Sequence, residues 1–340
     1  MEGLALVVGA GGIGRQIAED LASKENNLEV ILCGRKNVLG NIGSFSGFYS
    51  LPKGYKDPVL VACTDGVGTK VALAQRNSSL ETIGQDLVAM CINDMVTSGA
   101  KPLFFLDYFA SSKLDVNEAS KVIKGIAKAC KMSGCSLIGG ETAEMPDHYI
   151  GNNFDLAGFS VGVVEKKLII DAKKVRKNNI IIGIESSGAH SNGYSLINKL
   201  VKKSSLSKTE RQKLIKLALK PTHLYATVIL DLLKKVKVKS IANITGGGLI
   251  ENIPRSIPNN LSSEIYLDNW EMSPLFKTLQ KLGKIHLDDM LRIFNCGIGM
   301  TVVIDPKDLN ETQKVLSKHK FKSFMIGKVI QNTKRKINFI

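Results

Sequence analysis

Apolar and polar residues follow two kinds of pattern along the chain. Short runs rich in valine and isoleucine predict strands at residues 59–63, 103–108, 136–138 and 180–184, and around Ile241, Ile265 and Met300. Longer segments with helical spacing of apolar residues predict helices at residues 82–98, 116–133, 194–202 and 222–235. The alternation of strands with helices predicts an α/β protein.

The length of the chain and a change in composition near its middle indicate two domains. Its 340 residues exceed the roughly 100–200 of a typical domain, and 44% of them are hydrophobic, which is enough for two cores. Residues 165–179 are charged and rich in lysine, which suits a surface connection between domains. We therefore expect one domain at residues 37–170 and another at residues 171–340, with residues 1–36 as a separate opening segment.

The formal net charge of +15 raises the question of a nucleic-acid partner. The lysines are scattered in pairs and short groups without interleaved aromatic residues, a pattern typical of solvated surface. A diffuse positive field would still attract phosphorylated substrates. We expect small phosphorylated ligands and no nucleic acid.

The cysteines and the apolar runs bear on the cellular compartment. Six cysteines are widely spaced, form no C-x-x-C pair and have few histidines nearby, so they indicate buried, reduced thiols. The start of the chain lacks the unbroken apolar core of a signal peptide, and no apolar stretch approaches the ~20 residues of a membrane span. We expect a cytoplasmic protein without a membrane partner.

The segment T-D-G-V-G-T-K at residues 64–70 directly follows a predicted buried strand. Its glycines would let backbone N–H groups approach phosphate oxygens, and Lys70 would neutralise them. Asp65 offers the hard oxygen ligand that suits Mg²⁺. The spacing differs from that of a P-loop, and a tight turn without a ligand is the alternative.

Polar side chains interrupt the apolar helix predicted at residues 82–98. Asp86 and Asn93 are seven residues apart and therefore share one helical face, which Asp94 flanks. Carboxylates beside so much core surface require a cation or a hydrogen-bond partner. The alternative is an amphipathic helix with an acidic solvent side.

Two further segments, residues 139–146 and 186–194, place small and polar residues at strand ends, where open α/β sheets bind ligands. A third and a fourth segment, residues 245–248 and 294–300, are rich in glycine. His190 in the second segment could be a structural histidine, but its small polar neighbours leave it little apolar surface to pack on. The glycines of the third segment could present amides to an anion near a helix start. For the fourth segment, a glycine-rich buried strand is the alternative.

Taken in order, the chain contains D-G-V-G-T-K, I-G-x-D-L-V-A-M-C-x-N-D, G-A-K-P-L-F-F-L-D-Y, G-G-E-T-A-E-M-P, S-S-G-x-H-S-N-G-Y-S-L, T-G-G-G-x-x-E-N-I-P-R and F-N-C-G-x-G-M. These seven segments closely resemble the phosphoribosylformylglycinamidine cyclo-ligases, also called aminoimidazole ribonucleotide synthetases. The resemblance runs from about Val38 to the C-terminus. It implies two-domain subunits that form a homodimer, in which the N-terminal sheets pair into a shared barrel.

The resemblance also implies a reaction and its site. ATP would phosphorylate the amide oxygen of formylglycinamidine ribonucleotide, and an internal nitrogen would then displace phosphate to close the ring. The implied cofactor is Mg²⁺, with K⁺ as an optional further cation. The implied metal ligands are Asp65 and Asp94, and the implied ATP-binding residues are these two with Gly66, Gly68, Thr69, Lys70 and Glu141. The implied catalytic residues are His190, Asp94 and Lys70, and the implied site of the ribose phosphate is Gly246, Gly247, Gly248 and Asn192.

The first 36 residues depart from this family. Gly9, Gly11 and Gly14 satisfy G-x-G-x-x-G between a strand and a helix, and Arg35 ends a second strand. This segment resembles the opening βαβ unit of a dinucleotide-binding reductase, and it replaces the family segment that brings a lysine to ATP. Two alternatives follow: a nucleotide-binding homologue with impaired catalysis, or an NADP-linked oxidoreductase.

Overall fold

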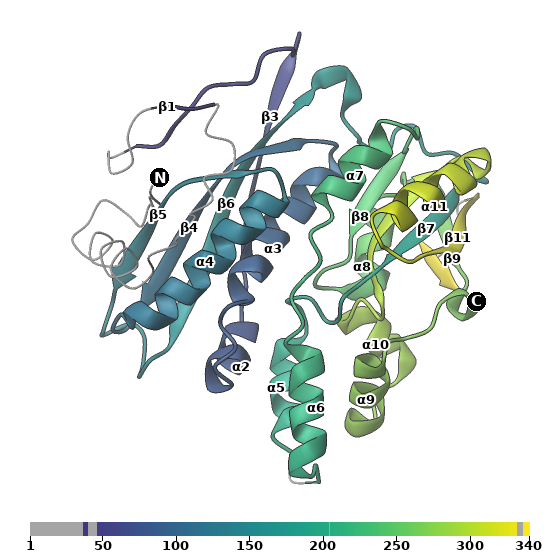
Figure 1. Ribbon diagram of the computed structural model, residues 1–340. Helices are drawn as coiled ribbons and strands as arrows, with labels where there is room; N and C mark the ends of the chain where they lie inside the picture. The colour runs from purple at the N-terminus through teal and green to yellow at the C-terminus, as the bar shows by residue number, and fades with distance from the viewer. Residues whose placement is uncertain (1–36, 40–45, 204, 332–335) are drawn as a thin grey trace. The chain divides into compact units, whose positions relative to one another are not determined.

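The computed structural model describes residues 37–39, 46–203, 205–331 and 336–340 (Figure 1). The expected βαβ segment at residues 1–36 lies outside the described residues. The chain divides into two compact units, of which the first ends at Lys167 and the second begins at Leu168. The short segment Val96–Gly99 groups with the second unit.

The first unit is built on a four-stranded sheet in the order β3-β6-β4-β5. Strands β4 and β5 are parallel, and the other neighbours are antiparallel. Helices α3 and α4 lie against one face of this sheet (Figure 1). The elements of this unit are β1 (Val38–Leu39), β2 (Phe48–Tyr49), β3 (Pro58–Gly66), α2 (Lys70–Arg76), α3 (Ile83–Thr97), β4 (Lys101–Ser111), α4 (Val116–Met132), β5 (Ser136–Glu144) and β6 (Phe154–Glu165).

The helices predicted at residues 82–98 and 116–133 are confirmed as α3 and α4; α3 is one residue shorter at each end and α4 is one residue shorter at its C-terminal end. Local chemistry sets both ends of α4. Asp115 caps its start by accepting hydrogen bonds from the backbone N–H groups of Asn117 and Glu118. Its end is followed by Gly134 with φ of +67°, a left-handed conformation that terminates helices.

Glycines determine how closely the two helices approach the sheet and each other. A Cβ at Gly158 of β6 would meet Leu87 and Cys91 of α3 at 3.2 and 2.9 Å. A Cβ at Gly84 of α3 would meet the backbone of α4 at Val122, closer than any real contact. Only glycine therefore permits α3 to lie this close to both neighbours.

Strand β5 is longer than the sequence predicts. The expected strand ends at Ile138, and the segment after it was expected to be a ligand-binding loop, but the strand continues to Glu144. The reason is tertiary: Gly140 and Glu141 pair with Asp107 and Tyr108 of the parallel strand β4. Hydrogen bonds to a neighbouring strand override the weak strand preference of the two glycines.

The second unit contains a six-stranded sheet in the order β12-β9-β11-β7-β10-β8. Among the paired strands that the structure describes in this sheet, only β12 and β9 are parallel. Helix α7 packs against α11, α8 packs against α10, and α5, α6 and α9 contact one another. The strands are β7 (Ile180–Glu185), β8 (Ser240–Asn243), β9 (Leu261–Ile265), β10 (Ile298–Ile304), β11 (Ser323–Gln331) and β12 (Ile337–Phe339). The helices are α5 (Tyr194–Val201), α6 (Lys208–Ala218), α7 (Ala226–Leu233), α8 (Gly248–Arg255), α9 (Pro274–Gly283), α10 (Leu287–Ile293) and α11 (Leu309–Lys318), with short 3₁₀ turns at Lys166–Leu168, Leu267–Asn269 and Pro306–Asp308.

The expected α/β class is confirmed, although most strand pairs are antiparallel. The helix predicted at residues 222–235 is α7, which begins at Ala226. Residues 220–225, which include Pro221, adopt no regular structure. The strand predicted around Met300 is β10, so the glycine-rich buried strand is the correct alternative for the end of that segment. Within the described residues, no helix combines the length and the apolar character that crossing a membrane requires.

Candidate functional site

Two carboxylates influence each other electrostatically where β3 ends beside α3. Asp65 lies near the end of β3, and the carbonyl oxygen of Asp65 is 3.9 Å from the Sγ of Cys91 on α3. Burial raises the pKa of the Asp65 carboxyl, and the negative charge of Asp94 raises it further, while the N–H of Gly66, 2.7 Å from Oδ1, acts in the opposite direction. Asp94 is exposed to solvent. The two expected metal ligands therefore lie close together, and their mutual repulsion favours an added cation.

This pair fits a magnesium ion that arrives with a nucleotide. Across the described residues, no group of three or more His, Cys, Asp and Glu side chains could hold a metal by itself. Mg²⁺ commonly takes one or two carboxylates and completes its shell with water and phosphate oxygens. The neighbouring thiol of Cys63 stays protonated at neutral pH, because burial, Asp94 and Asp65 raise its pKa to about 11.

The loop after Asp65 presents backbone to solvent. Gly68 has φ of +65° and open space around its Cα, and both Gly68 and Thr69 are exposed. A Cβ at Gly66 would lie 3.0 Å from the carbonyl oxygen of Leu156, so this position favours glycine for packing. The amides at 68 and 69 are thus placed where an anion can approach them.

The side chain of Lys70 is buried, whereas the sequence predicts that it contacts phosphate. Its ammonium lies 2.8 Å from Asp86 Oδ1, and both side chains are 0% exposed. Burial lowers the pKa of Lys70, and the charge of Asp86 opposes that shift. The lysine expected to contact phosphate is therefore enclosed in the core, where it supplies the cation that the carboxylate on the apolar helix requires.

Glu141 does not join the acidic pair. Gly66, Ala157, Tyr108 and Glu141 form one row across the sheet, from the edge strand β3 to the opposite edge strand β5. Three strand spacings separate the ends of this row by about 14 Å. The exposed Glu141 side chain also lies on the face opposite to the helices, because its neighbour Gly140 faces Asp107 on the helix side.

A buried carboxyl that the sequence patterns did not single out lies between these edges. Asp107 is on β4, in the same row as Asp65, and only the glycine at position 140 leaves room for its Oδ1. Burial raises the pKa of Asp107 to about 7, and its own backbone N–H opposes the shift. Asp107 belongs to the segment F-F-L-D-Y, which is one of the segments that resemble the family. The spacing of polar residues in the sequence did not indicate a function for it.

In the second unit, His190 is a packed side chain. It is 2% exposed, has φ of +56°, and its Nε2 accepts a hydrogen bond from the N–H of Ser187. Its ring centroid is 6.1 Å from that of Tyr225, and a Cβ at Gly299 would collide with both rings. The premise that His190 lacks a surface to pack on is therefore wrong. The imidazole shapes the loop that contains it.

The expected anion-binding residues of the second unit do come together. Gly246, Gly247 and Gly248 lead into α8, and a Cβ at Gly246 would lie 3.6 Å from Oδ1 of Asn192. The side-chain nitrogen of Asn192 and the hydroxyl of Ser191 are buried, and neither has a hydrogen-bond partner among the described residues. Donors without partners beside the start of a helix are suited to an anion.

Two asparagines to which the sequence patterns assigned no role hold these loops. Asn252 Nδ2 donates to the carbonyl oxygens of Gly246 and Gly248 at 2.9 and 2.8 Å. Asn295 Nδ2 donates to the carbonyl of Gly188 at 2.8 Å, and its Oδ1 accepts from the hydroxyl of Ser186 at 2.9 Å. Both asparagines lie in segments that resemble the family, and this resemblance is the sequence feature that could have identified them. Their bonds position the loops and do not reach solvent.

We expect Lys70→Met to lower the free energy of unfolding by about 3–5 kcal/mol, because it leaves the Asp86 carboxylate buried without its cation. The double variant Lys70→Met, Asp86→Asn removes both charges and should recover most of this loss. Urea unfolding followed by circular dichroism measures both values. A double variant as unstable as the single one would contradict the pairing.

We expect Asp107 to make the protein less stable as the pH rises from about 4 to 7. Its folded-state pKa of about 7 exceeds the ordinary value of 3.8, so in this window the native state holds a proton that the unfolded state has lost. A tenfold difference in acidity between the two states corresponds to about 1.4 kcal/mol, so the loss of stability is on the order of a few kcal/mol. Asp107→Asn should flatten this part of the stability profile, measured by denaturant unfolding at several pH values. Equal slopes in both proteins would exclude Asp107 as the source.

Known proteins match both units. The family model "AIR synthase related protein, N-terminal domain" matches residues 51–164, and "AIR synthase related protein, C-terminal domain" matches residues 176–339. The phosphoribosylformylglycinamidine cyclo-ligase of Paraburkholderia phymatum is 47% identical over 301 residues, which are 88% of this chain and 85% of that protein.

Solved structures with much lower identity share the fold. Thiamine-monophosphate kinase from Stenotrophomonas maltophilia has a TM-score of 0.62 at 16% identity, covering 90% of this chain and 92% of that one. The hydrogenase maturation protein HypE in complex with ATP has a TM-score of 0.65 at 16% identity, covering 98% and 94%. Likeness at this level of identity concerns the backbone alone. The two matched domains and the relative at 47% identity go further: the chain belongs to the phosphoribosylformylglycinamidine cyclo-ligase family.

Proposed function

We propose that this protein closes the imidazole ring of aminoimidazole ribonucleotide, using ATP and formylglycinamidine ribonucleotide, in purine biosynthesis. The observation that carries the proposal is the 47% identity to a phosphoribosylformylglycinamidine cyclo-ligase over 88% of the chain. The acidic pair of the first unit and the glycine loop of the second support it, because the reaction needs a nucleotide site and a site for a ribose phosphate.

The proposed reaction has two steps. The amide oxygen of the substrate attacks the γ-phosphorus of ATP, the bond to the bridging oxygen breaks, ADP leaves, and the amide nitrogen releases its proton. An internal nitrogen then attacks the activated carbon and loses its proton, the carbon–oxygen bond breaks, and phosphate leaves with that oxygen. Phosphorylation converts a poor leaving group into a good one, and the ring closure is favoured because its nucleophile belongs to the same molecule.

The first unit would serve the nucleotide. Asp65 and Asp94 would hold Mg²⁺, which screens the charge of the phosphates during transfer. The exposed backbone amides at Gly68 and Thr69 would contact phosphate oxygens. Lys70 would act through the buried pair with Asp86, which fixes the start of α2 directly after this loop.

The second unit would serve the substrate. The amides at Gly246 and Gly247 and the side-chain nitrogen of Asn192 would hold the ribose phosphate. Gly248 would keep the loop in shape, because its N–H donates to the carbonyl oxygen of Thr245. Glu251 lies in the first turn of α8, where its charge would repel an anion, but its Oε1 is 3.5 Å from the guanidinium of Arg292. His190 would keep the loop of residues 186–193 in place.

We propose a cytoplasmic setting for the reaction, which the free thiols of the described chain fit. Five cysteines of the described chain are free thiols: Cys63, Cys91, Cys130, Cys135 and Cys296. Burial raises the pKa of the thiols of Cys63 and Cys296, to about 11 and about 12. Thiols that stay protonated react slowly with oxidants, and disulfides are rare in reducing compartments such as the cytosol.

The assay for aminoimidazole ribonucleotide with purified protein, ATP, Mg²⁺ and the substrate tests the function. We expect one ADP for each product molecule, and a loss of about a hundredfold in kcat for Asp94→Asn because a charge that acts on the transferring phosphoryl group disappears. Asp288→Asn, an exposed carboxylate at the start of α10, is the matched control and should keep full activity. Tight magnesium-dependent ATP binding without any product would instead identify a nucleotide-binding homologue, and tight NADPH binding without any product would identify an oxidoreductase.

We further propose a homodimer formed through the sheet of the first unit. On the face that α3 and α4 leave uncovered, Leu60 of β3 is 62% exposed and Phe159 of β6 is 47% exposed. Phe104 on the same face contacts Tyr49, whose ring centroid is 5.2 Å away. An apolar sheet face at this exposure is suited to pairing with a second copy, as the family resemblance implies.

We expect light scattering at micromolar concentration to give the mass of a dimer, and Leu60→Glu combined with Phe159→Glu to give a monomer, because each interface would bury unpaired carboxylates. Ile150→Glu is the control, since Ile150 is 85% exposed in the turn between β5 and β6. A monomeric wild-type protein would contradict the proposal.

A further inference from the structure

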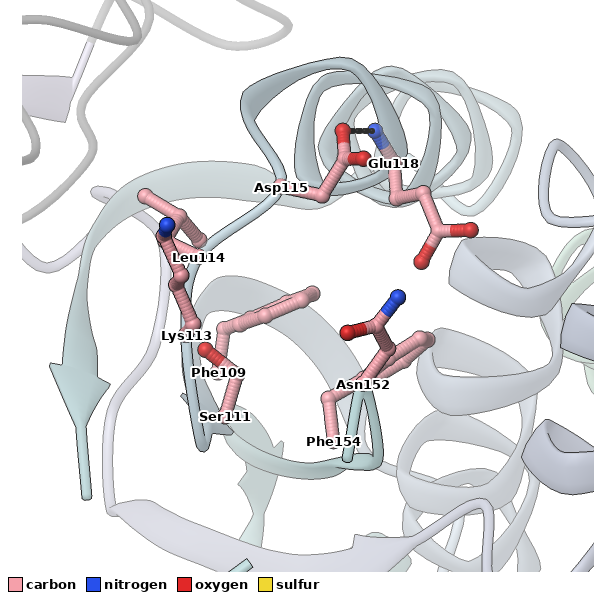
Figure 2. Close-up of a pocket in the computed structure, with 8 residues that line it drawn as sticks. All are labelled: Phe109, Ser111, Lys113, Leu114, Asp115, Glu118, Asn152 and Phe154. Atoms are coloured by element: carbon pink, nitrogen blue, oxygen red, sulfur yellow. Dashed lines mark hydrogen bonds between the residues drawn. The ribbon is translucent and has the colours of Figure 1, made fainter. Parts of the chain in front are cut away.

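A pocket of about 150 Å³ opens where β4 ends and α4 begins, in the first unit (Figure 2). None of its residues belongs to the acidic pair, the loop of residues 66–70 or the glycine loop. It is lined by Phe109, Ser111, Lys113, Leu114, Asp115, Glu118, Asn152 and Phe154. The pocket is large enough for one compact organic group.

The floor of the pocket is aromatic. Phe109 of β4 and Phe154 of β6 stack with ring centroids 4.8 Å apart and an angle of 16° between the rings. Both rings are buried, and Figure 2 shows them below the carboxylate of Glu118. An aromatic floor offers apolar contact to a flat group and attracts a cation to its face.

Beside this floor lies a buried hydroxyl that needs a partner. Ser111 is 3% exposed, it lines the pocket, and its Oγ has no hydrogen-bond partner among the described residues. A buried hydroxyl without a hydrogen-bond partner destabilises the protein, and a polar ligand that hydrogen-bonds to it would remove this cost. The site is therefore built for a ligand with at least one polar group.

One wall presents a carboxylate in a fixed position. Gln75 Nε2 donates to Glu118 Oε2 at 3.0 Å and to the backbone carbonyl of Asn152 at 2.6 Å. The second oxygen of Glu118 accepts no bond from any described residue, and Figure 2 shows the Glu118 carboxylate and the Asn152 amide directed toward the cavity. Because the bond from Gln75 already fixes the Glu118 side chain, this carboxylate would lose little conformational entropy when a ligand binds.

The charge of the pocket favours a cation. Asp115 and Glu118 contribute two negative charges against the single ammonium of Lys113, which lies on the opposite side of the cavity (Figure 2). Asp115 Oδ1 is used to cap α4, with N–H donors at 2.9 and 3.1 Å, so its charge is partly offset by the helix. Glu118 is left as the principal partner for a positive ligand.

We propose that this pocket binds the planar cationic group of a small amidinium or guanidinium compound. The N–H donors of such a group would meet Glu118 and the hydroxyl of Ser111, and its flat face would lie on the ring of Phe109. A phosphate would be repelled by the two carboxylates, and a purely apolar ligand would leave Ser111 without a partner. The assignment does not depend on the proposed ligase activity.

Benzamidine and its neutral analogue benzamide, which have the same shape, test the proposal on the full chain by titration calorimetry at pH 7.5. We expect benzamidine to bind saturably and at least tenfold more tightly than benzamide. Glu118→Gln should weaken benzamidine binding about tenfold, because one charged hydrogen bond is lost. Glu81→Gln, an exposed glutamate before α3, is the matched control and should bind like the wild type.

A second variant guards against loss of folding. Ser111→Val fills part of the cavity with an apolar group, and it should abolish benzamidine binding while circular dichroism shows an unchanged spectrum. Three results would each overturn the proposal: equal affinity for benzamidine and benzamide, equal affinity of the Glu118→Gln and Glu81→Gln variants, or no binding at about 10 mM benzamidine, a concentration at which weak ligands still bind.

Discussion

Helix α3 lies close against the sheet of the first unit because glycines at its contact points leave no side chain in the way. Gly158 of β6 faces Leu87 and Cys91, and Gly84 on the helix itself faces the backbone of α4. A methyl group at either position would force the helix outward, and overpacking of this kind typically costs about 1–3 kcal/mol or more. The position of every group on α3 depends on this close approach.

The acidic pair is a direct consequence. Asp94 is on α3 and Asp65 is on β3, so the distance between their carboxylates is set by how deeply the helix is seated. The buried ion pair of Lys70 with Asp86 ties the start of α2 to the same helix and so fixes the end of the loop that leads from β3 into α2. Two like charges in one place and two opposite charges in another thus have one structural cause. The first arrangement leaves two like charges near one another, and the second pair is fully buried.

Sequence patterns predict the helices and the shared face of Asp86 and Asn93 well, because local information suffices for them. The apolar spacing of residues 83–97 and 116–132 gives both helices, and seven-residue spacing places Asp86 and Asn93 on one face, where both are buried. The role of Lys70 was not predictable. A lysine after a glycine loop has the same sequence pattern whether it binds a phosphate or, as here, pairs with a carboxylate sixteen residues further along the chain. His190 was misjudged for a similar reason: the surface it packs on belongs to Tyr225 and to the space above Gly299, both distant in sequence.

Two glycines of the second unit, Gly246 and Gly248, differ in whether the packing of the fold requires glycine at their position. Gly248 has φ of +58°, and a Cβ there would collide with the backbone of Leu291, so the fold alone requires glycine at that position. Gly246 has no left-handed φ, and the nearest atom to its hypothetical Cβ is Asn192 Oδ1 at an ordinary 3.6 Å. The protein's own packing therefore gives no reason for glycine at 246. A ligand that must approach the backbone closely does give one, and the donors of Ser191 and Asn192 that lack partners lie in the loop beside it. The fold therefore requires glycine at 248, whereas at 246 the proposed anion site is the reason for glycine.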